Sequence, residues 1–133
     1  MKNKKKFSSG GKWEKIFGYS RAIKIKDRVI VTGTTSVDDN GNITGINNAY
    51  LQTKFIFQKI EKYLKEAGAE LNDVVLNRIY VINITDWEDV AKAHFEFFSE
   101  IRPCCTMIEV SGLINPDMLV EIETEAVIEE NDK

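Results

Sequence analysis

The 133-residue sequence has few of the residues that cross-link or interrupt small proteins: two cysteines, two prolines and one histidine. Cys104 and Cys105 are adjacent, and neighbouring strand side chains point to opposite faces, so a disulfide between them is not expected. Without a disulfide framework, the sequence favours a reducing compartment and a cytoplasmic protein. Adjacent cysteines cannot easily share one tetrahedral site with the histidine, so no metal is expected.

Long apolar runs and an excess of positive charge are also missing. No segment approaches the ~18 apolar residues of a membrane helix. The basic start, residues 1–6, is not followed by the apolar stretch of a secretory signal. The net charge is −3, whereas nucleic-acid-binding domains usually carry a basic surface. Phosphate-binding glycine motifs and a nucleophile elbow are absent. We therefore expect neither a membrane protein nor a nucleic-acid-binding protein.

The length and composition predict one soluble globular domain, with 43% hydrophobic and 29% charged residues. Residues 1–12 are polar and include Ser8-Ser9-Gly10-Gly11, which favours a flexible N-terminal tail. Trp13 buries too much surface to remain loose, so the ordered domain is expected to span residues 13–133.

Hydrophobic periodicity and turn residues predict the order β-β-α-β-α-β-β. The expected elements are a hairpin at 19–33, a helix at 49–67, a strand at 74–83, a helix at 87–100, and strands at 105–111 and 119–128. Asn47 or Asn48 and Gly68 suit the two ends of the first helix. Thr85 and Glu88 are spaced as a capping box for the second. The predicted fold class is α+β, with both helices on one face of a mixed sheet.

The last strand alternates between two kinds of side chain. Residues 120, 122, 124, 126 and 128 suit the face under the helices, whereas Glu121, Glu123 and Glu125 share the other face. Such a mixed face often meets another subunit, so we expect an oligomer. The glutamates either include a general acid or base, with Glu121 the strongest candidate, or are solvated or paired with Lys and Arg across a subunit boundary.

Four further groups could have a chemical or a structural role. Cys105 is a nucleophile if a nearby cation lowers its pKa, and otherwise an inert thiol, while Cys104 is expected in the core. His94 lies on the apolar stripe of its helix, which favours a structural histidine.

A strand end, Thr32-Gly33-Thr34-Thr35, either binds a small anion through N–H and hydroxyl groups or forms a β-bulge. Tyr19 either covers a pocket or packs.

Several motifs together resemble the YjgF/RidA family, also called the Rid or L-PSP family. The resemblance covers residues 13–128 and rests on G-Y-S-R-A at 18–22, D-R-V-I-V-T-G at 27–33, A-Y-x-Q-T at 49–53, E-A-G-A-x-L-x-D-V-V at 66–75, D-W-E-D-V-x-x-A-H-x-E-F-F at 86–98, R-P-x-x-T-M-x-E-V at 102–110 and V-E-I-E at 120–123.

This resemblance implies a chorismate-mutase-like fold and a homotrimer whose sheets face inward, with three sites at the subunit boundaries. The best-known members hydrolyse 2-aminoacrylate and related enamines or imines to 2-keto acids and ammonia, without a cofactor. In them an arginine of a Pro-x-Arg-Ser/Thr motif binds the substrate carboxylate.

Carried over by position, the resemblance assigns the strand-end glycine to Gly33, the N-terminal tyrosine to Tyr19 and the last-strand glutamate to Glu121. Cys105 stands in place of the arginine, and a thiol cannot form a bidentate pair with a carboxylate. Thr106 completes the motif. Arg102, which precedes Pro103, would need a backbone rearrangement to replace the missing guanidinium group.

The sequence supports three functional hypotheses. The first is a small-molecule hydrolase acting on an imine or enamine, with Glu121 polarising water and Gly33, Thr34, Thr106 and Tyr19 positioning the substrate. The second is a trimeric protein that binds a small metabolite without catalysis. The third is a ribonuclease, which the acidic charge balance and single histidine make the weakest.

Overall fold

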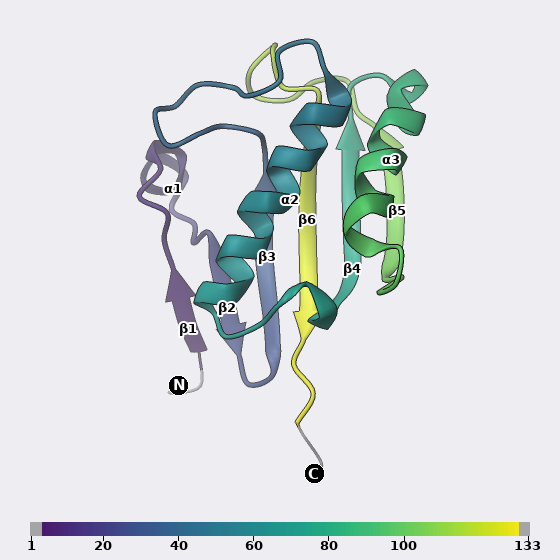
Figure 1. Ribbon diagram of the computed structural model, residues 1–133. Coiled ribbons are helices and arrows are strands. Elements are labelled where there is room, and N and C mark those ends of the chain that lie inside the picture. The colour runs from purple at the N-terminus through teal and green to yellow at the C-terminus, as the bar shows by residue number, and fades with distance from the viewer. Residues whose placement is uncertain (1–3, 131–133) are drawn as a thin grey trace.

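The computed structural model describes residues 4–130 and contains one six-stranded sheet with the order β1-β2-β3-β6-β4-β5 (Figure 1). The strands are β1 (Lys4–Phe7), β2 (Ala22–Ile25), β3 (Arg28–Thr34), β4 (Val74–Val81), β5 (Cys104–Glu109) and β6 (Val120–Val127). Only β4 and β5 pair in parallel, and the other neighbours are antiparallel. The predicted mixed sheet is confirmed.

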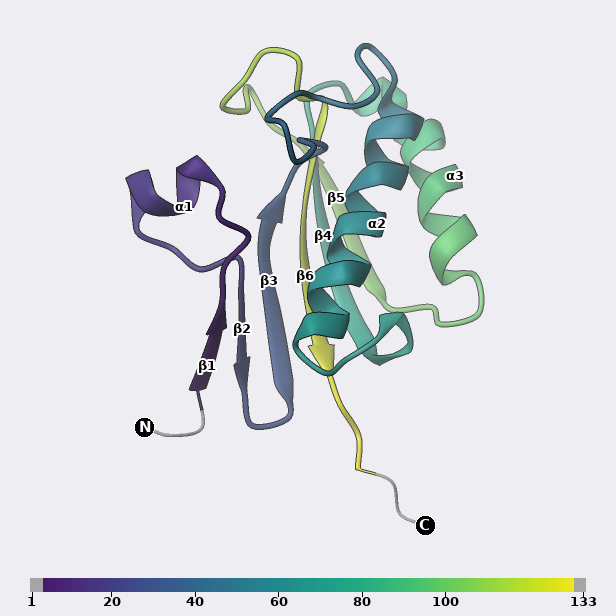
Figure 2. The ribbon, with the colours of Figure 1, turned by 60° about the vertical axis from the view of Figure 1, so that its left-hand side comes forward.

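Two long helices, α2 (Ala49–Glu66) and α3 (Trp87–Phe98), pack together on one side of the sheet (Figure 2). The Asn48 side chain accepts a hydrogen bond from the Leu51 N–H at the start of α2. Gly68 follows the end of α2 with a φ of 87°, a conformation that glycine adopts without steric cost. The first predicted helix therefore has both of its expected ends.

The core lies between these helices and the sheet, and β6 shows why. Val120, Ile122, Thr124 and Ala126 are buried, whereas the alternate positions are half-buried on the other face. This alternation follows from the two-residue period of a strand and confirms the predicted orientation of β6. Glu121, Glu123 and Glu125 consequently share the face that α2 and α3 do not cover.

The N-terminal segment differs from the predicted tail. Lys4–Phe7 forms β1 antiparallel to β2, and Lys12–Phe17 forms a short helix, α1, above β1 and β2 (Figure 2). Strand β1 is stable there because the edge of β2 offers hydrogen-bonding groups and Phe7 packs against the core. The other tail residues, 1–3, lie outside the described part of the chain.

The start of α3 also differs from the prediction, because the Thr85–Glu88 capping box does not form. One 3-10 turn, η1 (Leu71–Asp73), precedes β4, and another, η2 (Ile84–Asp86), precedes α3. Thr85 lies within η2, so Asp86 occupies the position before α3, without a side-chain cap. Backbone groups of η2 instead form hydrogen bonds within the turn, as where the Asp86 N–H donates to the Asn83 carbonyl at 3.0 Å.

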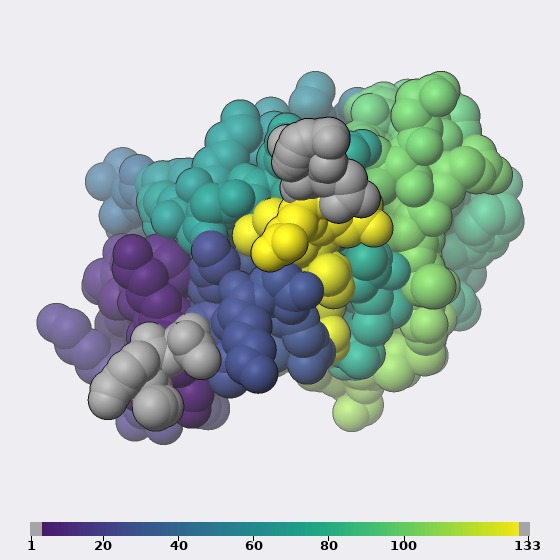
Figure 3. All heavy atoms as spheres, turned by 90° about the horizontal axis from the view of Figure 1, so that it is seen from below, coloured from purple at the N-terminus to yellow at the C-terminus, as the bar shows by residue number. Residues whose placement is uncertain are grey.

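The two ends of the sheet have different characters. The β2–β3 turn and the C-terminal segment gather at the lower end (Figure 3). The long loops before α2 and before β6 lie at the upper end, near α1 (Figure 1). None of the helices in residues 4–130 is long and apolar enough to cross a membrane.

Candidate functional site

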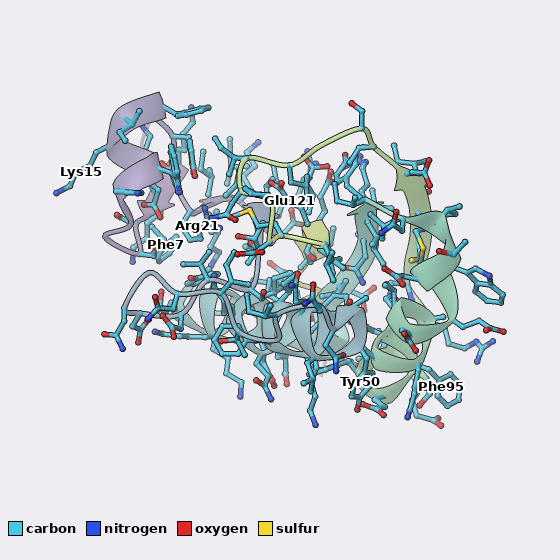
Figure 4. The ribbon with its side chains drawn as sticks, turned by 90° about the horizontal axis from the view of Figure 1, so that it is seen from above. Phe7, Lys15, Arg21, Tyr50, Phe95 and Glu121 are labelled. Carbon is cyan, nitrogen blue, oxygen red and sulfur yellow. The ribbon has the colours of Figure 1, made fainter. Side chains whose placement is uncertain are left out.

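A pocket of about 620 Å³ lies at the upper end of the sheet, between α1 and the main body. Its walls come from segments far apart in the sequence: residues 9–17, the β3 end, the loop at 37–39, α2, the loop before β6, and β6 itself. Figure 4 shows Arg21 and Glu121 lying near one another beside α1, and far from Phe95 on α3. Of the predicted site residues, Tyr19, Gly33 and Glu121 line this pocket.

Glu121 is the chemically distinctive carboxylate of the pocket. A Cβ atom on Gly33 would clash with its carboxylate, so glycine at position 33 makes room for Glu121. Burial, followed by the negative charge of Glu123, raises the pKa of Glu121, and the Arg21 cation partly opposes this. Among residues 4–130, no side chain or backbone group forms a hydrogen bond or ion pair with the Glu121 carboxylate.

The other two glutamates on this face have partners within the chain. Glu123 accepts a hydrogen bond from the Tyr80 hydroxyl at 2.7 Å. Glu125 accepts bonds from Arg78 at 3.2 Å and Arg28 at 3.1 Å. Glu125 is therefore paired with arginine inside one chain and not, as predicted, across a subunit boundary, whereas Glu121 has no such partner among residues 4–130.

Arg21 forms the floor of the pocket and is only 8% exposed. Its Nη1 donates to the Gly33 carbonyl at 3.2 Å and to the Thr34 hydroxyl at 3.1 Å, and its Nε lies 3.4 Å from Glu14 Oε2. The guanidinium group also lies 5.7 Å from the ring centres of both Tyr19 and Tyr63. These contacts hold a fixed positive charge beside the β3 end.

Glu14 fastens α1 over the pocket. Its carboxylate accepts hydrogen bonds from the Ser8 hydroxyl at 2.8 Å and from the Ser9 N–H and hydroxyl, and it pairs with Arg21. Burial opposes ionisation, but the bonds from Ser9 and Ser8 and the charge of Arg21 outweigh it and lower the pKa of Glu14. Glu14 is therefore a buried anion that joins the N-terminal segment to Arg21, the residue directly before β2.

An aromatic wall completes the α1 side of the pocket. The Trp13 and Phe17 rings meet edge to face with centroids 6.1 Å apart, and Phe17 meets Tyr19 in the same way at 6.1 Å. Tyr19 thus lies both against packed rings and in the pocket lining, which combines its two predicted interpretations.

Lys59 contributes a second cation, from α2. Its Nζ donates to the Thr35 carbonyl at 2.7 Å, and its side chain lines the pocket. Burial and the nearby Arg21 charge lower the pKa of Lys59 to about 8, against the opposing effects of Asp39 and Asp38.

Thr34 lies beneath the pocket and not in its lining. It is fully buried, and its hydroxyl donates to the Thr32 carbonyl at 2.8 Å while accepting from Arg21. The pairing of β3 with β6 shifts register between Val31 and Thr34, an irregularity that is compatible with the β-bulge interpretation of this strand end. Thr34 is placed to orient Arg21.

The remaining predicted residues lie on or beside β5, away from this pocket. Cys105 pairs with Asn77 and Thr106 with Arg78 on the edge of the sheet, and both are exposed in the single chain. Arg102 has a φ of 54° and donates to the Ser99 carbonyl at 3.3 Å, at the end of α3. The pocket of a single chain therefore combines Glu121, Gly33 and Tyr19 but not Cys105, Thr106 or Arg102.

Neither cysteine has the predicted surroundings of a core residue or an activated nucleophile. Cys104 is exposed, which contradicts its expected burial, because it begins an edge strand on the face without helices. Desolvation raises the pKa of the Cys105 thiol, opposite to the shift that would activate it.

His94 is a structural residue, as its position on the apolar stripe predicted. Its Nε2 lies 3.1 Å from Asn77 Nδ2, and its ring packs against Phe57 and Phe98. Asn77 in turn accepts a 2.6 Å bond from the Thr124 hydroxyl. Residues 4–130 contain no group of three His, Cys, Asp or Glu side chains arranged to hold a metal ion.

The sequence interpretation did not identify Arg21, Lys59 or Glu14 as pocket residues. Arg21 lies two residues after Tyr19 in the G-Y-S-R-A motif, and its place in that motif could have identified it as a site residue. Lys59 and Glu14 look like ordinary surface charges in sequence, because only the packing of α2 and α1 turns them toward the pocket.

Comparison with known proteins places this arrangement in a family. The model of the family described as Endoribonuclease L-PSP matches residues 12–128. An uncharacterized Streptomyces coelicolor protein is 35% identical over 92% of this chain and 90% of its own length. The 3-aminoacrylate deaminase RutC of Acinetobacter baylyi is 32% identical over 81% of this chain and 85% of its own.

Solved structures agree. A Mycobacterium tuberculosis member of the YjgF/YER057c/UK114 family superposes with a TM-score of 0.85 and 42% identity, covering 94% of this chain and 99% of that one. The Escherichia coli YjgF protein shares the fold, with a TM-score of 0.75 and 23% identity over 82% of this chain and 87% of its own. This chain therefore belongs to the YjgF/RidA family, whose model is described as Endoribonuclease L-PSP.

Proposed function

We propose that this protein hydrolyses the C=N bond of a small imine, supplied directly or by tautomerisation of an enamine, and releases a carbonyl compound and ammonia. The observation that carries the proposal is the Glu121 carboxyl group, which lies in the pocket with a raised pKa and no partner among residues 4–130. A carboxyl group whose pKa is raised above its ordinary value is a better proton donor reservoir than an ordinary glutamate and can still act as a base when ionised, as imine hydrolysis requires. The 32% identity to a 3-aminoacrylate deaminase supports the same class of reaction.

In the proposed mechanism, Glu121 acts twice. Its protonated form donates to the imine nitrogen, which makes the imine carbon more electrophilic. The resulting carboxylate then takes a proton from the attacking water, giving a carbinolamine. Protonation of the amine and collapse of the carbinolamine release ammonia and the carbonyl compound, so that one water is consumed in each turnover.

The charges of the pocket favour a substrate without a carboxylate. Arg21 and Lys59 are the cations in its lining, and each already donates to a backbone carbonyl. Four carboxylates, those of Glu14, Asp38, Asp39 and Glu121, share the lining. A neutral or cationic imine would meet less repulsion here than 2-aminoacrylate.

We further propose that the protein is a homotrimer in which β5 of a neighbouring subunit closes each pocket. In this arrangement Cys105 and Thr106 reach the site from the adjacent chain, and Tyr19, Gly33 and Glu121 come from the first. The exposure of Cys104, Cys105 and Thr106 on an edge strand supports this arrangement. Without a cation at position 105, a substrate carboxylate would lose a charge-assisted pair.

The test uses two imines generated in the assay by an amine or amino acid oxidase. One is the imine of a short aliphatic aldehyde, which has no carboxylate, and the other is 2-iminobutyrate. We expect the wild type to accelerate aldehyde release from the first and Glu121→Gln to lose about 10²-fold or more of that rate. We expect 2-iminobutyrate to be hydrolysed faster by Cys105→Arg than by the wild type. Equal aldehyde release with and without the wild-type protein would overturn the proposal.

A second candidate function is a non-catalytic protein that binds a small metabolite. The raised pKa of Cys105 and the loss of a cation at that position favour it, since both remove reactive groups from the β5 side. This function predicts that a molecule co-purifies with the protein and that neither imine is hydrolysed faster in its presence. Mass spectrometry of the denatured, freshly purified protein would identify such a molecule.

A further inference from the structure

Lys59 is a pocket residue that the proposed mechanism does not use. It projects from the middle of α2, is partly buried, and lines the same pocket as Glu121. One N–H of its amine donates to the Thr35 carbonyl at 2.7 Å, which fixes the position of the nitrogen. An amine held by one such bond keeps its remaining valences for a ligand.

The surroundings of this amine favour its neutral form. Burial and the positive charge of Arg21 act in this direction, as does Lys62 on the same helix, while Asp39 and Asp38 on the facing loop oppose it. With its pKa lowered to about 8, roughly one amine in ten is neutral at pH 7, against fewer than one in a thousand for an ordinary lysine. Desolvation beside another cation is a recognised way to make lysine nucleophilic.

We propose that Lys59 is a nucleophilic amine that captures the electrophilic carbon of a carbonyl or imine ligand in the pocket as a covalent lysine imine. The ligand class is a small aldehyde, ketone or their imines. Capture of a carbonyl compound does not depend on the proposed hydrolase function, whereas capture of an imine rests on it.

Each step of this capture balances. With an aldehyde or ketone, the Lys59 nitrogen adds to the carbonyl carbon, and the carbonyl oxygen leaves as water after two proton transfers. With an imine substrate, the nitrogen adds to the C=N carbon, and the original nitrogen leaves as ammonia. Water then adds to the lysine imine, the bond from carbon to Nζ breaks, and the carbonyl compound and the free amine return. Glu121, in the same pocket, supplies and accepts the protons.

The experiment traps the lysine imine by reduction. The full-length protein is mixed with limiting propionaldehyde and cyanoborohydride, and the alkylated lysines are identified by peptide mass spectrometry at early times. Lys62 is the matched control, because it is exposed on the same helix three residues away. We expect Lys59 to be alkylated at least tenfold faster than Lys62 at pH 7, with a rate that rises with pH to a plateau above about 8.

The variant Lys59→Arg keeps the positive charge and a donor for the Thr35 carbonyl. We expect it to lose the fast phase of labelling while Lys62 reacts at its wild-type rate. Alkylation that follows exposure, with Lys62 ahead of Lys59, would overturn the proposal, and so would a fast phase that survives in Lys59→Arg. Should that variant fail to fold, the ratio of Lys59 to Lys62 labelling in the wild type decides.

The trapping experiment and the hydrolysis assay can fail independently, so their outcomes distinguish the two proposals. Fast trapping without hydrolysis of either imine retains the nucleophilic Lys59 and removes the hydrolase function. Hydrolysis without trapping retains the hydrolase function and removes a covalent role for Lys59.

Discussion

Glu121 and Cys105 lie on strands of one sheet, but the single chain surrounds them very differently. Glu121 is on the interior strand β6, beside Gly33 and within a pocket that also contains Arg21. Cys105 is on the edge strand β5 and is exposed. One side of the candidate site is therefore assembled by the fold of one chain, whereas the β5 side would be completed only in the proposed trimer.

The two sides of the candidate site also differ in their positively charged groups. The β6 side contains two cations, Arg21 and Lys59, which are fixed by backbone carbonyls. The corresponding β5 position carries a thiol whose pKa is raised by desolvation. We therefore expect ligand recognition to depend mainly on residues that the fold of one chain holds in place.

The largest expected effect comes from Gln52→Ala, which would loosen the loops above the pocket. Gln52 is fully buried and forms bonds to Gly45 O at 3.1 Å, Asp117 O at 2.9 Å and Leu119 N at 2.9 Å. Removing it takes one hydrogen bond from each of three partly buried backbone groups, although the Gly45 carbonyl keeps its bond from the Asn48 N–H, so we expect a loss of about 3 kcal/mol in the free energy of unfolding. Urea denaturation measures this, with exposed Gln58→Ala on the same helix as control. Similar losses in both variants would contradict the assigned role of Gln52.

Gly33→Ala should disable the β6 side while leaving the fold largely intact. The added methyl group clashes with the end of the flexible Glu121 side chain, which can swing away at small cost. Displacement of the acid–base group should reduce imine hydrolysis about 10²-fold. Gly112→Ala is the matched control, since a Cβ there meets no atom within 4 Å. Wild-type activity in Gly33→Ala would show that the position of Glu121 is not critical.

Glu121→Gln should stabilise the protein at neutral pH. The pKa of Glu121 is raised in the folded state, so its proton stabilises the fold below the unfolded value of about 4.5, and this contribution is lost as pH rises through the folded pKa. Thermal melts between pH 4 and 8 should therefore show a Tm advantage for the variant that grows with pH and then levels off. Glu123→Gln, which weakens the bond to Tyr80, should instead lower the Tm. An advantage independent of pH would exclude this origin.

The smallest effect is expected from Cys104→Ser on the β5 side. The side chain is exposed on an edge strand, so the free energy of unfolding of the isolated chain should change by less than about 0.5 kcal/mol. Denaturation at low protein concentration measures the chain alone, and a repeat at high concentration reveals any contribution from assembly. A large loss at low concentration would mean that Cys104 is part of the core after all.

Periodicity predicted most of the fold, because α2, β6 and the β2–β3 hairpin bury one face along a regular repeat. The N-terminal segment escaped prediction, since β1 is a run of lysines ending in Phe7 and pairs only because the edge of β2 is free. The capping box failed for a related reason: the short turn before α3 formed its own backbone bonds.

The part of the candidate site that lies on or beside predicted strands could be predicted from the sequence. Gly33, Glu121 and Tyr19 were identified by their positions, and the structure brings them into one pocket. Arg21, Lys59 and Glu14 were not, because their roles depend on contacts between segments separated by long stretches of chain. Whether Cys105, Thr106 and Arg102 act in a site remains a prediction about an assembly.

Strand β1 gives the open sheet one protected border. Its residues Lys4, Lys5 and Lys6 are exposed along an outer edge whose backbone groups would otherwise accept another strand. Closely spaced ammonium groups repel a second copy of the same strand and discourage runaway sheet extension. We therefore expect that removal of Lys4–Phe7 would expose β2, a strand of apolar and basic residues, and would promote aggregation along this edge of the sheet.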